Sequence, residues 1–356
     1  MSGSATPVRG IDPELSANLY GGGCLDRLIT EAVAPFRSEL RRLDPRARLW
    51  AIRYNRRGEH LKLRIHTAAD PTAVEGLLRQ VADRAFRRLA PTPTERLPPP
   101  RFDVPAIDPE DDGAEPAADR SVLRTTYRRG RTTLGSRAIQ ADEGLVDAIH
   151  RALAGGFERL LDAPRADADK RLNRLLGSLI VGLTAAMPHP AARAAHLEYH
   201  RDWLFRFFVR ERDREEALRT SFERRLAGME PEIVVIRSAV AAPFVEPRDA
   251  DPWTLAMAVL AERLAGPTGD LALDPFATAP GQPVFFKVLH GVANVHGVPP
   301  LDEAFLCHLL LRALGPRPDE RGGESVGARA LADAASGARV ASRATANGAR
   351  TGGGGR

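Results

Sequence analysis

The chain has 356 residues, 43% of them hydrophobic, and a formal net charge of +5 at pH 7. This length suffices for one large domain or two ordinary ones with a real core, and the mild charge, carried mostly by arginine, does not indicate a nucleic-acid partner, so we expect none. Its two cysteines have neither disulfide-framework nor metal-ligand spacing, and no uninterrupted apolar run is long enough to span a membrane.

The N-terminal half is predicted to be an α/β unit with a small antiparallel sheet. Apolar residues recur every three or four positions in two segments, which indicates amphipathic helices, and a strand–turn–strand pattern between them indicates a β-hairpin. In chain order the expected elements are a flexible arm at 1–14, a helix at 25–40, strands at 49–54 and 60–66, a helix at 71–89, a proline-rich linker at 90–118 and a strand at 122–129.

The C-terminal half is predicted to be mainly helical. Residues 232–241 are compatible with a strand or a buried helix, and residues 316–356 have so few large apolar side chains that we expect a disordered tail. Helices are expected at 145–161, 172–183, 196–208, 215–226, 252–264, 284–295 and 302–314. The sequence therefore predicts one α+β domain at 15–315, with the sheet packed against the helical half. Residues 1–10 lack the apolar core of a signal peptide, so we expect a cytoplasmic protein.

The second strand of the hairpin has a polar face. Side chains alternate between the two faces of a strand, which places four cationic or titratable groups together: His60, Lys62, Arg64 and His66. Trp50 and Tyr54 of the preceding strand flank them. Such a face is either exposed to solvent, as in many antiparallel sheets, or contacts a polar or anionic ligand.

A second basic strand follows at 124–131, where Tyr127 and Arg129 share a face. If this strand pairs near the hairpin, the sheet gathers a pocket of arginine, lysine, histidine and tyrosine side chains. The alternative is an exposed edge strand that its charges protect from aggregation.

Histidines at helical spacing are the other candidates. His196 and His200 are four residues apart, a spacing found in zinc sites, but no third ligand is evident, so we expect no metal. His290 and Asn294 have the same spacing, which allows Asn294 to orient His290 for proton transfer. The alternative for His290 is a histidine that caps a helix or lies at the edge of the core.

Taken in order, these segments resemble one family. The thiopeptide-type bacteriocin biosynthesis domain, which is also the glutamate-elimination part of lanthipeptide dehydratases, is similar to this chain over about residues 15–315. The segments that carry the resemblance are Asn18–Tyr20 with the helix after it, Trp50–Tyr54, Gly58–Arg64 and Leu289–Asn294. The resemblance implies an elimination-domain-like catalytic fold in which Lys62, Arg64 and His290 surround a substrate peptide.

The sequence departs from the family's pattern where a glutamate-eliminating enzyme keeps arginine. The first arginine of the basic strand is Lys62, Thr133–Ser136 stands where an R-Y-G-G segment is expected, and Val295 replaces the arginine after the late asparagine. Arginine binds a glutamyl carboxylate through two parallel hydrogen bonds, so these losses argue against elimination. A stand-alone module that keeps the fold without these residues resembles the pyridine synthases of thiopeptide pathways.

That resemblance implies a cofactor-independent enzyme acting on a modified precursor peptide, leader and core. It joins two dehydroalanines by a formal aza-[4+2] cycloaddition and releases water and the leader peptide. On this hypothesis Tyr127 and His290 transfer protons, and Trp50 and Trp203 stack on azole rings. The other expected substrate contacts are Tyr54, His60, Lys62, Arg64, Arg129, His200 and Asn294.

Other functions stay open at this stage. The alternative enzyme is the glutamate-eliminating subunit of a split lanthipeptide-type dehydratase. A peptide-binding scaffold without catalysis and an unrelated basic binder are further alternatives. The sequence is also compatible with a homodimer and does not identify the precursor peptide or its ring size.

Overall fold

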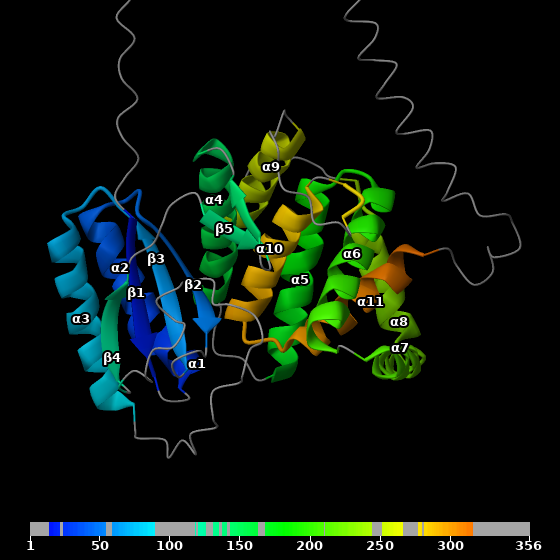
Figure 1. The fold of residues 1–356 in the computed structure, drawn as a ribbon, viewed down its shortest axis with the longest axis horizontal. Coiled ribbons are helices and arrows are strands. Elements are labelled where there is room, and N and C mark those ends of the chain that lie inside the picture. The colour runs from blue at the N-terminus through cyan, green and yellow to red at the C-terminus, as the bar shows by residue number, and fades with distance from the viewer. Residues whose placement is uncertain are drawn as a thin grey trace, which may run out of the picture.

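The computed structural model shows a sheet lobe beside a helical lobe (Figure 1). The described residues are 14–21, 24–54, 59–89, 118, 120–125, 131–134, 137–140, 143–162, 168–209, 211–243, 251–265, 277–279 and 281–315. Nearly all of the expected arm, most of the linker, the tail, and the candidates Tyr127 and Arg129 lie outside them. Within the described residues, no helix has the length and apolarity needed to cross a membrane.

The sheet lobe is built on four antiparallel strands in the order β2-β3-β1-β4. They are β1 (Glu14–Tyr20), β2 (Arg48–Tyr54), β3 (His60–His66) and β4 (Ser121–Thr125). The predicted hairpin is therefore confirmed. The sequence prediction missed β1, and it was wrong to place Glu14 in a flexible arm. Serine, asparagine and alanine give β1 a weak strand propensity, and pairing with β3 on one side and β4 on the other stabilises it.

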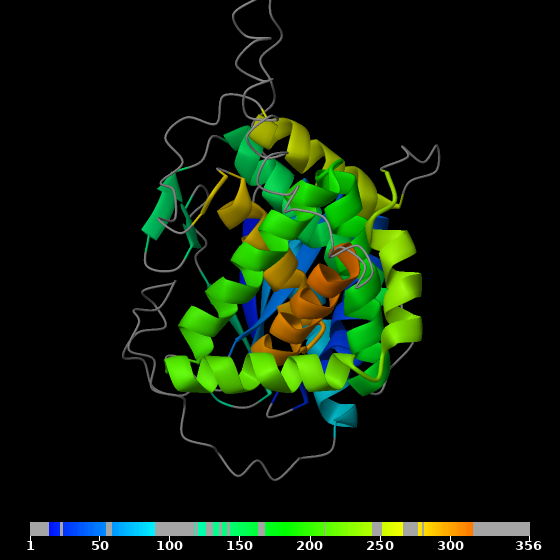
Figure 2. The same cartoon turned by 90° about the vertical axis from the view of Figure 1, so that its right-hand side faces the viewer.

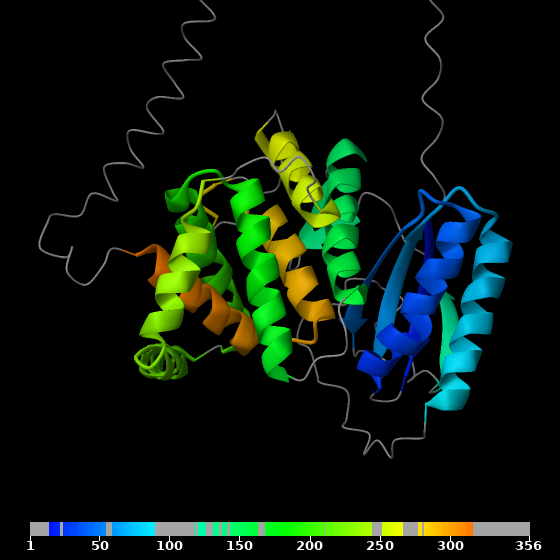
Figure 3. The same cartoon turned by 180° about the vertical axis from the view of Figure 1, so that it is seen from behind.

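Helices cover one face of this sheet (Figure 3). They are α1 (Leu25–Leu28), continued by a π-helical turn η1 (Ile29–Val33) into α2 (Ala34–Leu43), and α3 (Pro71–Arg88). Asp70 caps α3 by accepting a hydrogen bond from the Ala73 N–H, 2.8 Å away. Both predicted helices are confirmed, and their apolar stripes pack in the core with the alternate residues Leu61, Leu63 and Ile65 of β3.

The helical lobe contains α4 (Glu143–Leu161), α5 (Ala168–Ala186), α6 (Pro190–Phe208), α7 (Arg212–Leu226), α8 (Glu230–Val240), α9 (Pro252–Ala265), α10 (Gln282–Val295) and α11 (Pro300–Leu314). The ambiguous segment 232–241 is thus helical. The short strands β5 (Arg131–Leu134) and β6 (Arg137–Gln140) form a separate antiparallel pair, which the sequence did not predict. Figure 2 shows α10 and α11 in orange with other helices of the lobe around them.

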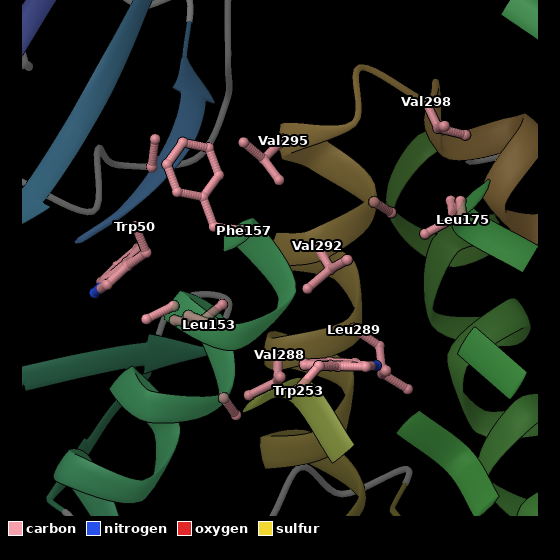
Figure 4. Packing of buried hydrophobic residues seen from close by; sticks show 14 of the residues in the cluster. Trp50, Leu153, Phe157, Leu175, Trp253, Val288, Leu289, Val292, Val295 and Val298 are labelled. Atoms are coloured by element: carbon pink, nitrogen blue, oxygen red, sulfur yellow. The ribbon is translucent and has the colours of Figure 1, made fainter. Parts of the chain in front are cut away.

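A continuous hydrophobic core joins the two lobes. Trp50 of β2, Phe157 of α4 and Val295 of α10 meet at the junction (Figure 4). Deeper in the helical lobe, Trp253 fills a slot beside Gly182, where an added Cβ would lie 2.7 Å from indole Cζ2. The Trp253 indole N–H donates to the Ser178 carbonyl oxygen at 3.0 Å, so this large side chain is buried without an unsatisfied donor.

Candidate functional site

Three side chains from three helices form a buried histidine–glutamate cluster: His200 of α6, His290 of α10 and Glu303 of α11. His200 Nε2 lies 2.7 Å from Glu303 Oε1, and His290 Nδ1 lies 2.8 Å from Glu303 Oε2. One carboxylate therefore binds two imidazoles, one through each oxygen. Two of the members, His200 and His290, were predicted site residues, and the structure brings them together.

The electrostatics of the cluster are strongly coupled. Burial raises the pKa of Glu303, but the charge of His290 and the hydrogen bonds from both imidazoles outweigh it and bring the pKa to about 2. Burial lowers the pKa of His290, but the attraction of Glu303 and its hydrogen bond outweigh burial, and the net shift is upward despite repulsion from Lys287. The Glu303 side chain is 0% exposed and that of His290 27%, so His290 is the member that a substrate can reach.

An aromatic wall (Trp203, Phe207, Phe208 and Phe286) borders His290. Phe286 stacks on the His290 ring with centroids 5.2 Å apart, and Trp203 lies 4.2 Å from Phe286. Trp203 also stacks on Phe207 at 4.6 Å, and Phe207 and Phe208 remain 38% and 43% exposed. The wall therefore leads from the molecular surface to His290. Trp203 was a predicted site residue, whereas the three phenylalanines were missed.

The polar sheet face (His60, Lys62, Arg64 and His66 of β3) is buried, so of the two alternatives the solvent-exposed face is wrong. The Lys62 ammonium lies 4.0 Å from the centroid of the Tyr54 ring, and Arg64 Nη1 donates to Ser16 Oγ on β1. The Tyr54 and His60 rings have centroids 5.5 Å apart. The sequence correctly predicted that these side chains share one face, because the strand alternation fixed their direction.

Two buried polar atoms on the same face have no hydrogen-bond partner within the described residues: the indole Nε1 of Trp50 and Oδ1 of Asn18. A buried donor or acceptor without a partner is uncommon in folded proteins and often marks a place where a ligand or water binds. The Trp50 ring lies 5.5 Å from that of His150, and His150 Nδ1 is 3.0 Å from His66 Nε2. The sequence indicated Asn18 only through the family resemblance and did not predict its position on a central strand.

Asn294 has a partner other than the one that the helical spacing suggested. Its side-chain Oδ1 accepts from the Arg53 N–H at 2.6 Å, and its Nδ2 donates to the Arg53 carbonyl at 3.2 Å. It thus closes the outer edge of β2, while Glu303 binds His290. Arg53 completes the junction by donating to the Val295 carbonyl at 3.0 Å and to Asp26 Oδ1 at 2.5 Å. Asn294 and His290 lie one helical turn apart, so α10 connects the sheet lobe to the cluster.

His196 lies behind the histidine–glutamate cluster. Its ring centroid is 5.7 Å from that of His200, and both of its nitrogens are buried without a hydrogen-bond partner in the described part of the chain. Burial lowers the pKa of His196 well below its usual value. No set of three histidine, cysteine or acidic side chains among the described residues has the geometry of a metal site.

The family model for the C-terminal region of lantibiotic biosynthesis dehydratases matches residues 15–314. The chain belongs to this family. The resemblance inferred from the short motifs is thereby confirmed, and the predicted fold class with it. A search of curated proteins finds no match.

Two solved structures share the dehydratase C-terminal fold with this chain. One is described as the pyridine synthase TbtD from thiomuracin biosynthesis, with a TM-score of 0.56, 18% identity, and coverage of 85% of this chain and 98% of TbtD. The other is TsrL, with a TM-score of 0.52, 12% identity, and coverage of 85% of this chain and 94% of TsrL. At these identities the similarity shows a common fold and leaves the reaction to be argued from the site.

Proposed function

We propose that this dehydratase-family chain is a thiopeptide pyridine synthase. It joins two dehydroalanines of a modified linear peptide by a formal aza-[4+2] cycloaddition and releases water and the leader peptide. The observation that carries the proposal is a partly exposed imidazole, bound to a buried carboxylate and bordered by an aromatic wall. The sequence around it lacks the arginines that a glutamate-eliminating enzyme needs.

The chemistry suits a site that positions a peptide and exchanges protons. Holding two dehydroalanines in contact converts a bimolecular encounter into an intramolecular step, which is worth up to about 7–11 kcal/mol in favourable cases. An amide first takes its iminol form, which needs a proton donor and an acceptor. Each later elimination delivers one proton to the leaving group and removes one from the ring. One acid–base group can therefore carry out both transfers and return to its starting protonation state.

His290 is the proposed proton-transfer group, with Tyr127, outside the described residues, as a second one. Trp203 and Trp50 are proposed to stack on azole rings of the core peptide. Lys62, Arg64 and Arg129 are proposed to bind the peptide backbone or the leader. Because Trp50, Lys62 and Arg64 are buried, a peptide that contacts them must displace the groups that now shield them.

The second candidate is the glutamate-eliminating subunit of a split dehydratase, which the family's description favours. Such an enzyme expels a glutamyl group from a modified serine or threonine. The carboxylate of that glutamyl group would need an arginine that binds it through two parallel hydrogen bonds. At the positions expected by resemblance, Val295 and the segment 133–136 provide no arginine. We therefore rank the cyclase first.

Two incubations, each followed by mass spectrometry, separate these functions. A linear, azole-bearing peptide with two dehydroalanines and its leader is expected to yield a macrocycle, free leader amide and water. A glutamylated serine peptide is expected to remain unchanged. Conversion of only the glutamylated peptide would establish the eliminase, and binding of the dehydroalanine peptide without a mass change would establish a scaffold.

A further inference from the structure

Glu303 is a buried charge with a defined set of hydrogen bonds. Its side chain is 0% exposed, and each of its oxygens faces one imidazole nitrogen, at 2.7 Å for His200 and 2.8 Å for His290. An ionised carboxylate accepts hydrogen bonds and cannot donate, so both facing nitrogens carry hydrogen. An isolated buried carboxylate is costly unless a cation pairs with it. One of the two imidazoles must therefore supply the positive charge.

The hydrogen-bond pattern identifies which imidazole does so. His200 Nδ1 is buried and has no partner in the described part of the chain, so a proton there would be an unsatisfied buried donor. His200 therefore donates through Nε2 and leaves Nδ1 without hydrogen. The His290 side chain is 27% exposed, and its Nε2 is not among the buried atoms without a partner, so a proton on Nε2 is not left unsatisfied. The positive charge accordingly belongs on His290.

We propose that His200 and Glu303 are positioning residues that hold His290 as an imidazolium, so that His290 enters the reaction as the proton donor through Nε2–H. This inference rests on the proposed function for its reaction step. In the loss of water, the Nε2–H bond breaks as an O–H bond forms on the ring hydroxyl, and the C–O bond then breaks. The neutral imidazole takes the proton of an adjacent ring C–H, whose electron pair forms the new double bond, and the imidazolium is restored.

The charge state of His290 depends on groups from three helices. Glu303 of α11 stabilises the imidazolium, Lys287 on α10 itself opposes it, and His200 of α6 holds the second oxygen of Glu303. The two aromatic rings beside the His290 ring, Phe286 and Trp203, are uncharged. The cluster therefore extends the imidazolium to higher pH than a solvent-exposed histidine, and the rate is expected to fall only as the pH rises through this raised value.

The direct test is a nitrogen-15 NMR titration of the histidine rings in the full chain without substrate. His290, assigned by its loss in His290→Asn, is expected to titrate above 6.5, the ordinary value for histidine, with hydrogen on Nδ1 throughout. His200 is expected to show the Nε2–H tautomer. Titration of His290 below 6.5, or a hydrogen on His200 Nδ1 in place of Nε2, would overturn the inference. This measurement needs no variant of Glu303 to fold.

Variants then connect the charge to catalysis. Glu303→Gln is expected to move the alkaline limb of the kcat profile to lower pH, so that the rate at pH 8 falls about tenfold with KM nearly unchanged. His200→Gln keeps an amide donor for Oε1 and is expected to retain most of the rate, whereas His200→Phe loses it. His196→Phe, a matched buried histidine that does not bond to Glu303, is the control and should leave the profile unchanged.

The outcomes separate this inference from the proposed function. A folded Glu303→Gln variant with the wild-type pH profile would overturn the positioning role while the cyclase stands. If His290 titrates as expected but no dehydroalanine peptide is converted by the wild-type chain, the charge-holding role stands and the proposed function falls. If Glu303→Gln does not fold, the contrast between His200→Gln and His200→Phe decides: equal rates would overturn the positioning role.

Discussion

The two lobes accommodate buried charge in different ways. In the helical lobe, the fully buried Glu303 binds two imidazoles, and the fully buried Arg193 donates to four backbone carbonyls. In the sheet lobe, Lys62 contacts an aromatic ring and Arg64 a serine hydroxyl on the next strand. The imidazoles and carbonyls that bind these charges in the helical lobe are held in place by helix packing, whereas the serine hydroxyl beside Arg64 can rotate to a new partner. Removing a buried charge should therefore cost more in the helical lobe.

Replacement of Arg193 is expected to lower the free energy of unfolding more than any other change considered. Its guanidinium donates to the carbonyls of Met187, Pro188, Val240 and Ala242 at 2.6–3.1 Å, which ties the start of α6 to the ends of α5 and α8. Arg193→Leu leaves these acceptors without donors, so the free energy of unfolding should fall by about 3–5 kcal/mol in urea denaturation. Arg206→Leu, an exposed arginine on the same helix, should change it by less than about 0.5 kcal/mol. A loss below about 1 kcal/mol for Arg193→Leu would contradict the contrast between the lobes.

His296, at the junction between the lobes, gives the next effect. Burial, with added repulsion from Arg174, Arg53 and Arg159, lowers its pKa to about 4. The folded state thus disfavours the imidazolium form of His296. The contribution of His296 to the free energy of unfolding is therefore fully present above the ordinary pKa of 6.5, and it is lost as the pH falls from 6.5 to about 4. We expect about 3 kcal/mol of acid-dependent stability from this residue.

Urea unfolding at pH 7 and pH 4.5 measures that dependence. His296→Phe should flatten the difference between the two pH values, and His189→Gln, an exposed histidine, should not. Equal pH dependence of the unfolding free energy in wild type and His296→Phe would show that His296 is not a buried neutral histidine in the folded state.

Ser16→Ala tests the sheet lobe at a smaller scale. The Ser16 hydroxyl contacts Arg64 and lies 2.5 Å from the Thr125 hydroxyl. We expect a loss of about 1.5 kcal/mol, because Arg64 keeps its contact with the Leu63 carbonyl at 3.2 Å. Ser38→Ala, at an exposed helical serine, is the matched control for differential scanning calorimetry. A loss as large as that of Arg193→Leu would show that the two lobes fix buried charge equally.

The exposed ion pair of Arg42 and Glu39 is expected to have the smallest effect on the free energy of unfolding. These residues lie 2.7 Å apart on α2, but solvent screens them, so Arg42→Ala should change the unfolding free energy by less than about 0.5 kcal/mol. The less exposed Arg37, which binds Glu158 at 2.5 Å and Asp162 at 2.9 Å on α4, should be more costly to replace by alanine. The same urea assay compares them, and the reverse order would contradict this account.

Local periodicity was enough to predict most of the fold. The hairpin, the helices of the sheet lobe and the late pair of helices all follow from apolar spacing that matches the period of each element. Strand β1 was missed because its stability comes from two neighbouring strands and not from its own residues. The pair β5 and β6 was missed for a related reason: four-residue strands are too short to show a period.

The candidate site was predicted only in part. The sequence placed His290 and His200 among the candidates, and strand alternation placed Lys62 and Arg64 on one face. Glu303 was missed because an acidic residue in the first turn of a helix is ordinary, and its partner His200 lies 103 residues away. The pairing of Asn294 with Arg53 likewise joins residues 241 positions apart. Helical spacing alone therefore predicted His290 as the partner of Asn294.

The central claim is that His290 serves a peptide cyclisation, and one comparison tests it most directly. Wild type and His290→Asn are each incubated with the dehydroalanine-bearing linear peptide, and the products are followed by mass spectrometry. The account predicts that wild type loses one water and the leader amide per turnover, and that His290→Asn, folded to the same melting temperature, is at least about a hundredfold slower. Equal rates for the two chains, or no mass change with wild type, would contradict it.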